Sequence, residues 1–144
     1  MSRDKLAAIA AVLAVILVIL LGFHFLGSPA SQRLIQSDMR TVQALSQLAA
    51  QIQIKTHDSN NEIPANLSSF PESLRQDPIT RKPFLYTPKS KTTYHLCATF
   101  QAKSPDPPSP SASQSNEDNW AHPAGDHCFS FDVTQAVPPA PYFN

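Results

Sequence analysis

The chain has its longest run of apolar residues close to its beginning. From Leu6 to Leu26 there are 21 residues without Asp, Glu, Lys or Arg, and His24 is the strongly polar residue among them. As a helix this run spans roughly 31 Å, which is close to the thickness of the hydrocarbon core of a bilayer. The pattern predicts a transmembrane helix over residues 6–26, preceded by a short N-terminal segment, residues 1–5.

The charges beside this run predict its orientation. Arg3 and Lys5 lie directly before it, and no charge follows it until Arg33. By the positive-inside rule, the N-terminus then lies in the cytoplasm and the rest of the chain lies outside it. A cleaved secretory signal is the alternative, because Ser28 and Ala30 suit a cut after Ala30. The apolar region of a signal is shorter than this one, which favours a retained anchor.

A second pattern follows in residues 31–57, where apolar residues recur at steps of three and four. This spacing places them along one face of an amphipathic helix. The stripe consists of Ile35, Met39, Val42, Leu45, Leu48, Ala49 and Ile52. We expect it to pack on a sheet of the same domain, with a partner helix as the alternative. Polar residues 57–61 and then Pro64 end the helix.

Three later segments alternate apolar and polar residues, which is the pattern of half-buried strands. Phe84–Tyr86 and Thr92–Phe100 are joined by a polar loop and predict a hairpin, and His127–Val133 predicts a third strand. The expected fold class is therefore α+β, with an amphipathic helix packed on a small antiparallel β-sheet. The expected domain covers residues 31–133.

Two segments are not expected to join this core. Residues 104–119 are rich in Pro and Ser and almost lack apolar side chains, which predicts a disordered loop. Its end, Asn116–Asn119, offers oxygen atoms to calcium but lacks the glycine and the alternating spacing of a calcium loop. Residues 134–144 contain three prolines and predict an irregular tail.

Composition narrows the functions that such a domain can have. The 144 residues include 11 Lys and Arg against 11 Asp and Glu, so the formal net charge is zero. A nucleic-acid partner is not expected, because phosphate binding needs a basic surface. The chain contains no G-x-S-x-G, P-loop or H-E-x-x-H pattern, so we expect no catalytic residues and no enzyme activity.

The two cysteines, Cys97 and Cys128, occupy equivalent positions in their predicted strands, each facing away from its large apolar neighbours. If the strands pair, a disulfide can form, because the predicted export leads to an oxidising compartment. The bridge would close a loop of about thirty residues and contribute roughly 3–4 kcal/mol. The alternative is a zinc or copper site that joins both cysteines to His95, His122 and His127. Since no compact ligand spacing is present, no metal and no cofactor are expected.

Trp120 lies at the end of the Pro/Ser-rich segment, directly before the third strand. We expect its ring to pack back onto the core and to anchor the chain there. The alternative is a binding site in which Trp120 stacks on a ligand with His122 and His127 beside it.

The order of these parts resembles that of pilin-like proteins. The resemblance is carried by four segments, Asp38–Leu45, Asp77–Tyr86, Tyr94–Phe100 and Trp120–Phe129. They look like the post-membrane helix, the Asp-Pro turn before the first strand, and two paired blocks of small single-pass bacterial membrane proteins related to type II secretion pseudopilins. The chain lacks the glycine and the Phe-Thr-Leu-x-Glu that follow each other in type IV pilins, which argues against prepilin peptidase processing.

The resemblance implies a place in the bacterial inner (cytoplasmic) membrane, with the N-terminus in the cytoplasm and the C-terminal domain outside. It implies a membrane-anchored structural or interaction module of the cell envelope. The expected partners are the lipid bilayer and envelope or secretion-machinery proteins. The alternative function is a ligand- or metal-binding envelope domain that uses Trp120, His122 and His127.

Overall fold

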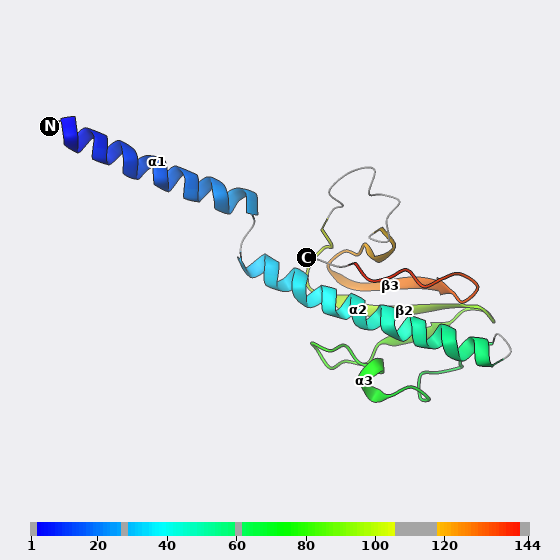
Figure 1. Ribbon diagram of the computed structural model, residues 1–144. Helices are drawn as coiled ribbons and strands as arrows, with labels where there is room; N and C mark the ends of the chain where they lie inside the picture. The colour runs from blue at the N-terminus through cyan, green and yellow to red at the C-terminus, as the bar shows by residue number, and fades with distance from the viewer. Residues whose placement is uncertain (1–2, 27–28, 60–61, 106–117, 142–144) are drawn as a thin grey trace. The chain divides into compact units, whose positions relative to one another are not determined.

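The computed structural model describes residues 3–26, 29–59, 62–105 and 118–141 (Figure 1). The chain divides into two compact units, Met1–Arg33 and Leu34–Asn144. Its elements in chain order are α1 (Arg3–Leu26), α2 (Pro29–Asp58), α3 (Glu72–Arg75), β1 (Leu85–Pro88), β2 (Thr93–Phe100), the 3-10 helix η2 (Asp118–Trp120) and β3 (Gly125–Asp132).

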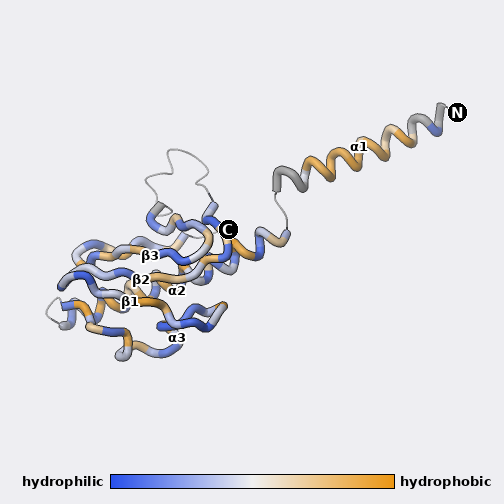
Figure 2. The backbone as a smooth tube through the Cα atoms, turned by 180° about the vertical axis from the view of Figure 1, so that it is seen from behind, coloured by the Kyte–Doolittle hydropathy of each residue, from blue (hydrophilic) through white to orange (hydrophobic). Residues whose placement is uncertain are grey.

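Helix α1 carries apolar side chains on all its sides, and Figure 2 shows their colour along most of its length. The large apolar side chains described between Ile9 and Leu21 are 47–67 % exposed. Nevertheless, within the described part of the chain, no helix has both the length and the apolarity that crossing a membrane requires. On this finding the predicted transmembrane helix over residues 6–26 is wrong, and so is the single-pass location in the inner membrane.

The sheet has three antiparallel strands in the order β1-β2-β3. Strand β1 pairs with β2 from Leu85 opposite Cys97 onward, and β2 pairs with β3 over their full lengths of eight residues. The α+β class with a small antiparallel sheet is therefore confirmed. The three strands lie within two residues of the positions that the alternation predicts.

The core lies between α2 and one face of the sheet, and Figure 1 shows α2 running across β2. The central part of the predicted stripe is fully buried, whereas Ile35 and Met39 near its beginning are only half-buried. Tyr94 joins the two layers directly, because its hydroxyl donates to the carbonyl oxygen of Ala49 at 3.4 Å. The core residues are Val42, Leu45, Leu48, Ala49, Ile52, Leu67, Phe70, Phe84, Tyr94, Leu96, Phe100, Trp120, Phe129 and Phe131.

The connector between α2 and the sheet is organised by Asp77. One of its carboxylate oxygens accepts hydrogen bonds from the backbone N–H groups of Ile79 and Thr80, and the other accepts one from the hydroxyl of Thr41 at 2.9 Å. The predicted Asp-Pro turn is thus also an anchor on α2. This arrangement fixes the point where the chain enters β1.

The described part of the tail, residues 133–141, has no helix or strand and runs beside α2. The amide of Gln53 donates to the carbonyl oxygens of Val133 and Gln135, and the hydroxyl of Ser46 donates to the carbonyl oxygen of Pro138. These hydrogen bonds fasten the described part of the tail to the helix through its backbone carbonyls. Most of the predicted Pro/Ser loop, residues 106–117, lies outside the described residues.

Candidate functional site

The disulfide joins Cys97 to Cys128, as predicted, with an S–S distance of 2.05 Å. The two residues lie directly opposite each other in β2 and β3. Their neighbours along the strands, Leu96 and Phe129, point into the core, so the bridge lies on the outer face of the sheet. Cys128 is exposed and Cys97 is half-buried, which leaves the bridge accessible to solvent.

Trp120 is 2 % exposed and belongs to the core, at the end of the short helix η2. Its ring packs against Phe129 and Phe131, with centroid distances of 5.0 and 5.7 Å. Its indole N–H points at the carbonyl oxygens of Pro138 and Pro139, at 3.3 and 3.2 Å. Trp120 therefore holds the tail against the core, in line with the expected anchoring role.

His122 is also buried, and its ring stacks on that of Phe100 at a centroid distance of 3.8 Å. Burial lowers the pKa of His122 below its usual 6.5, while the carbonyl of Pro123 and the carboxylate of Asp38 act in the opposite direction. Its backbone pairs with Ser104, whose N–H donates to the His122 carbonyl oxygen at 2.9 Å. His122 thus ties the chain before β3 to the chain after β2.

His127 is half-buried and meets the ring of Phe129 edge-on at 4.9 Å. It lies close enough to His122 for its charge to lower the pKa of that histidine. Both cysteines are in the disulfide, and the described residues contain no group of three or more His, Cys, Asp or Glu side chains that could hold a metal ion. A ligand role for Trp120, His122 and His127 stays a prediction.

Sequence reasoning did not identify the role of Asp38, which is 4 % exposed in α2. Its carboxylate accepts hydrogen bonds from the backbone N–H of Gln101 at 2.9 and 3.0 Å and from that of Ala102 at 2.7 Å. These donors lie directly after β2, so Asp38 fastens the end of the central strand to the helix. The signal in the sequence is a charged residue inside the apolar stripe, one position before Met39.

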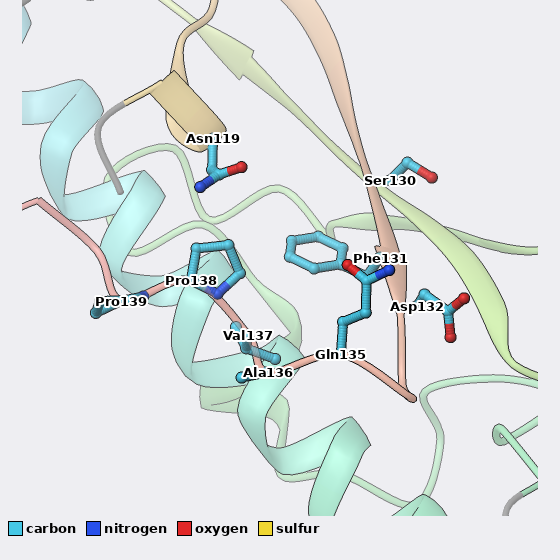
Figure 3. Close-up of a pocket in the computed structure, with 9 residues that line it drawn as sticks. All are labelled: Asn119, Ser130, Phe131, Asp132, Gln135, Ala136, Val137, Pro138 and Pro139. Atoms are coloured by element: carbon cyan, nitrogen blue, oxygen red, sulfur yellow. The ribbon is translucent and has the colours of Figure 1, made fainter. Parts of the chain in front are cut away.

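A cavity of about 300 Å³ lies between β3 and the tail (Figure 3). The figure shows the ring of Phe131 on the side of Asn119 and Pro138, while the side chains of Ser130 and Asp132 point to the other side of the strand. The amide of Gln135 lies beside Phe131 and also lines the cavity. The cavity therefore combines an apolar floor with amide groups that can donate and accept hydrogen bonds.

A second cavity, of about 270 Å³, lies on the outer face of the sheet beside the disulfide. Leu85, which is 62 % exposed, and Ala98 contribute apolar surface, and Lys82 and Asp126 contribute charges of opposite sign. It is shallow, and its lining comes from all three strands and the turn before β1.

The outer edge of β3 is the open edge of the sheet. The N–H of Val133 donates to the carbonyl oxygen of Thr92, so the alternation of an antiparallel ladder directs the backbone groups of residues 131, 129 and 127 toward β2. Those of Asp126, Cys128 and Ser130 then point away from β2. Among the described residues, no strand pairs with this edge.

No family model, curated protein or solved structure matches this sequence. The chemistry of the chain must therefore be argued from its own residues.

Proposed function

We propose that the chain is a non-enzymatic structural and interaction module, a pilin-like domain that works by contact with proteins of a bacterial secretion or pilus machinery. The link to that machinery rests on the resemblance of the segments Asp38–Leu45 and Asp77–Tyr86. The order of elements supports it, since an apolar helix, an amphipathic helix, an Asp-Pro turn and an antiparallel sheet follow one another.

The observation that carries the proposal is the contrast between the two units. Leu34–Asn144 closes its own core, with Leu45, Leu48 and Ile52 fully buried. Among the side chains described in helix α1, ten large apolar ones are instead exposed. An exposed apolar surface of this extent marks a site of contact with other molecules. The module is therefore a domain with its own closed core, attached to a helix whose exposed apolar surface is available for contact with other molecules.

The use of the buried polar groups also supports a structural role. Asp38, Asp77 and Trp120 each join segments that are distant in sequence: the end of β2, helix α2 and the tail. A group that is already committed to such contacts is held by the fold rather than presented to a substrate. The two buried aromatic residues of the alternative ligand site, Trp120 and His122, belong to this structural set.

The test is crosslinking in the native cell. A photoreactive amino acid replaces Val18, which is 67 % exposed in α1, in the full-length chain. The matched control carries the same group at Ile54, which is 56 % exposed on α2. After irradiation, mass spectrometry identifies the adducts of each variant.

We expect the Val18 variant to form adducts with secretion or pilus proteins and the Ile54 variant to form none at that position. Adducts from Val18 that contain only lipid or the chain itself would refute the proposed function. A metal or small ligand that co-purifies in a fixed ratio with the chain, and is lost in His127→Ala, would favour the alternative.

A further inference from the structure

We propose that the open edge of β3 binds an extended segment of a partner protein, which adds to the sheet as a fourth, antiparallel strand and carries Lys or Arg at its two ends. This inference rests on the proposed function and names the surface and the chemistry of one contact. It is carried by the backbone groups of β3 that pair with no strand among the described residues, by the charges on its outer face and by the cavity beside it.

The two edges of the sheet are not equivalent. Strand β1 has only four residues and ends in Pro88, which has no N–H to donate. Two contacts tie the chain before β1 to this end of the sheet: Gln76 bridges to Pro83, and the hydroxyl of Tyr86 donates to the carbonyl oxygen of Pro64. Strand β3 has eight residues without Pro or Lys, the usual protections of an exposed edge.

The open edge of β3 presents backbone groups that can form hydrogen bonds with an added strand. The N–H and C=O groups of Cys128 and Ser130 point away from β2, in the middle of the strand. The disulfide and the buried rings of Phe129 and Phe131 hold the strand on both faces. A strand that is already extended and fixed loses little conformational freedom when another strand binds, which favours this kind of recognition.

The outer face of β3 is acidic at both ends. Asp126 and Asp132 are its charged residues, and β3 contains no Lys or Arg. The backbone N–H and the hydroxyl of Thr134 donate to the Asp132 carboxylate and hold its pKa below the usual range, so it stays ionised. Side chains directly opposite each other in a sheet interact, and opposite charges there are favourable. The fitting partner therefore has a basic residue opposite each carboxylate.

A second copy of the same chain fits less well. If two β3 strands paired antiparallel over their whole length, Asp126 of each would lie opposite Asp132 of the other. Like charges that face each other across strands are destabilising. The charges therefore favour a different, basic segment over self-association.

The cavity accepts the other face of the added strand. Side chains of a strand alternate between the two faces, so the residues between the basic ones point toward Asn119, Val137 and Pro138. Its volume of about 300 Å³ has room for small apolar side chains such as Val. The expected segment thus alternates basic or small polar residues with small apolar ones.

The test uses the full-length chain in mild detergent and the labelled peptide Lys-Val-Thr-Val-Thr-Val-Lys, whose binding is followed by fluorescence anisotropy. The charge control is Glu-Val-Thr-Val-Thr-Val-Glu, which we expect to bind about tenfold more weakly. Two further peptides carry N-methyl groups. Methylation of the two Thr amides removes the donors that face β3 and should weaken binding at least about tenfold, whereas methylation of the second and third Val amides should leave it within about twofold.

Changes in the protein place the contact on β3. The double variant Asp126→Asn, Asp132→Asn keeps one acceptor oxygen at each position but removes both charges, and we expect it to bind the Lys and Glu peptides equally within about twofold. Hydrogen exchange of the unchanged protein with bound Lys peptide should slow at the amides of Cys128 and Ser130.

Equal binding of the two methylated peptides, no binding of the Lys peptide, or protection at amides outside β3 would each overturn the inference. A dimer of the free chain with protected Cys128 and Ser130 amides would overturn it in favour of a second copy. The test is independent of the crosslinks from Val18, so loss of those crosslinks alone would remove the proposed function and not the peptide site.

Discussion

Removing the hydrogen bonds that Asp38 accepts should cost a large part of the stability of the domain. The Asp38 carboxylate is buried, and it accepts three hydrogen bonds from two backbone N–H groups, those of Gln101 and Ala102. Asp38→Ala removes all three and detaches the end of β2 from α2. Because α2 and β2 form the two layers of the core, the effect should appear as a loss of global stability.

The expected loss in the free energy of unfolding follows from the two backbone N–H groups that donate to Asp38. A hydrogen bond to a charged group contributes about 1.5–3 kcal/mol, so two donors would give about 3–6 kcal/mol if both became fully unpaired. Gln101 is exposed and Ala102 is half-buried, so water replaces part of the loss. The better helix propensity of Ala returns about 0.5 kcal/mol. We expect Asp38→Ala to lower the free energy of unfolding by about 2–3 kcal/mol.

The assay is urea unfolding of the full-length chain, followed by the fluorescence of its single tryptophan, Trp120, which is buried in the core. Asp38→Asn keeps one acceptor oxygen and should lose about half as much stability as Asp38→Ala. The control is Asp58→Ala, at the exposed end of the same helix, where a change within about 0.5 kcal/mol is expected. An Asp38→Ala protein within 0.5 kcal/mol of the wild type, with unchanged m-value, would refute the role assigned to this carboxylate.

Three further changes probe other parts of the domain. The double variant Cys97→Ser, Cys128→Ser should unfold with a free energy about 4 kcal/mol lower in urea titrations, because the bridge closes a sequence separation of 31 residues; equal midpoints for oxidised and reduced protein would contradict this. Burial keeps the pKa of His122 below 6.5, so the unfolded chain binds more protons and the free energy of unfolding should fall as the pH drops below 6.5. His122→Gln should flatten this pH dependence, and a variant whose stability falls with pH in parallel with the wild type would contradict the role of His122. Burial raises the pKa of Tyr86 to about 12, so the unfolded chain releases this proton first and the free energy of unfolding should fall from about pH 10 upward. The difference in phenolate absorbance between the wild type and Tyr86→Phe, followed as a function of pH, measures the pKa of Tyr86.

Periodicity in the sequence predicted the elements whose side chains have one buried face. The three-and-four spacing of Val42, Leu45 and Ala49 identified the helix, and the alternation in β2 and β3 identified the sheet. The same alternation placed Cys97 and Cys128 on the face away from the core, so the disulfide was predictable once the two strands were assumed to pair. These features depend on which face a residue occupies, which local spacing determines.

Contacts between distant segments were not predictable in this way. The hydrogen bonds that Asp38 accepts from Gln101 and that Asp77 accepts from Thr41 join residues 63 and 36 positions apart. Nothing in the local pattern says which backbone group a buried carboxylate will meet. The transmembrane prediction rested on the apolar composition of residues 6–26, and it is wrong because no helix in the described part of the chain is both long and apolar enough to cross a membrane.

The properties of β3 show how one strand can serve both the core and a partner. Its inward residues, Phe129 and Phe131, pack against Trp120, and its outward Cys128 is bonded to β2. These contacts are supplied from within the domain, and the backbone groups at the open edge take no part in them. Asp126→Asn on the outer face keeps an acceptor for the hydroxyl of Thr99 and should then affect binding without unfolding the domain, whereas changes at Phe129 should affect both. This separation follows from the geometry of a strand, in which the two faces and the two edges point in four different directions.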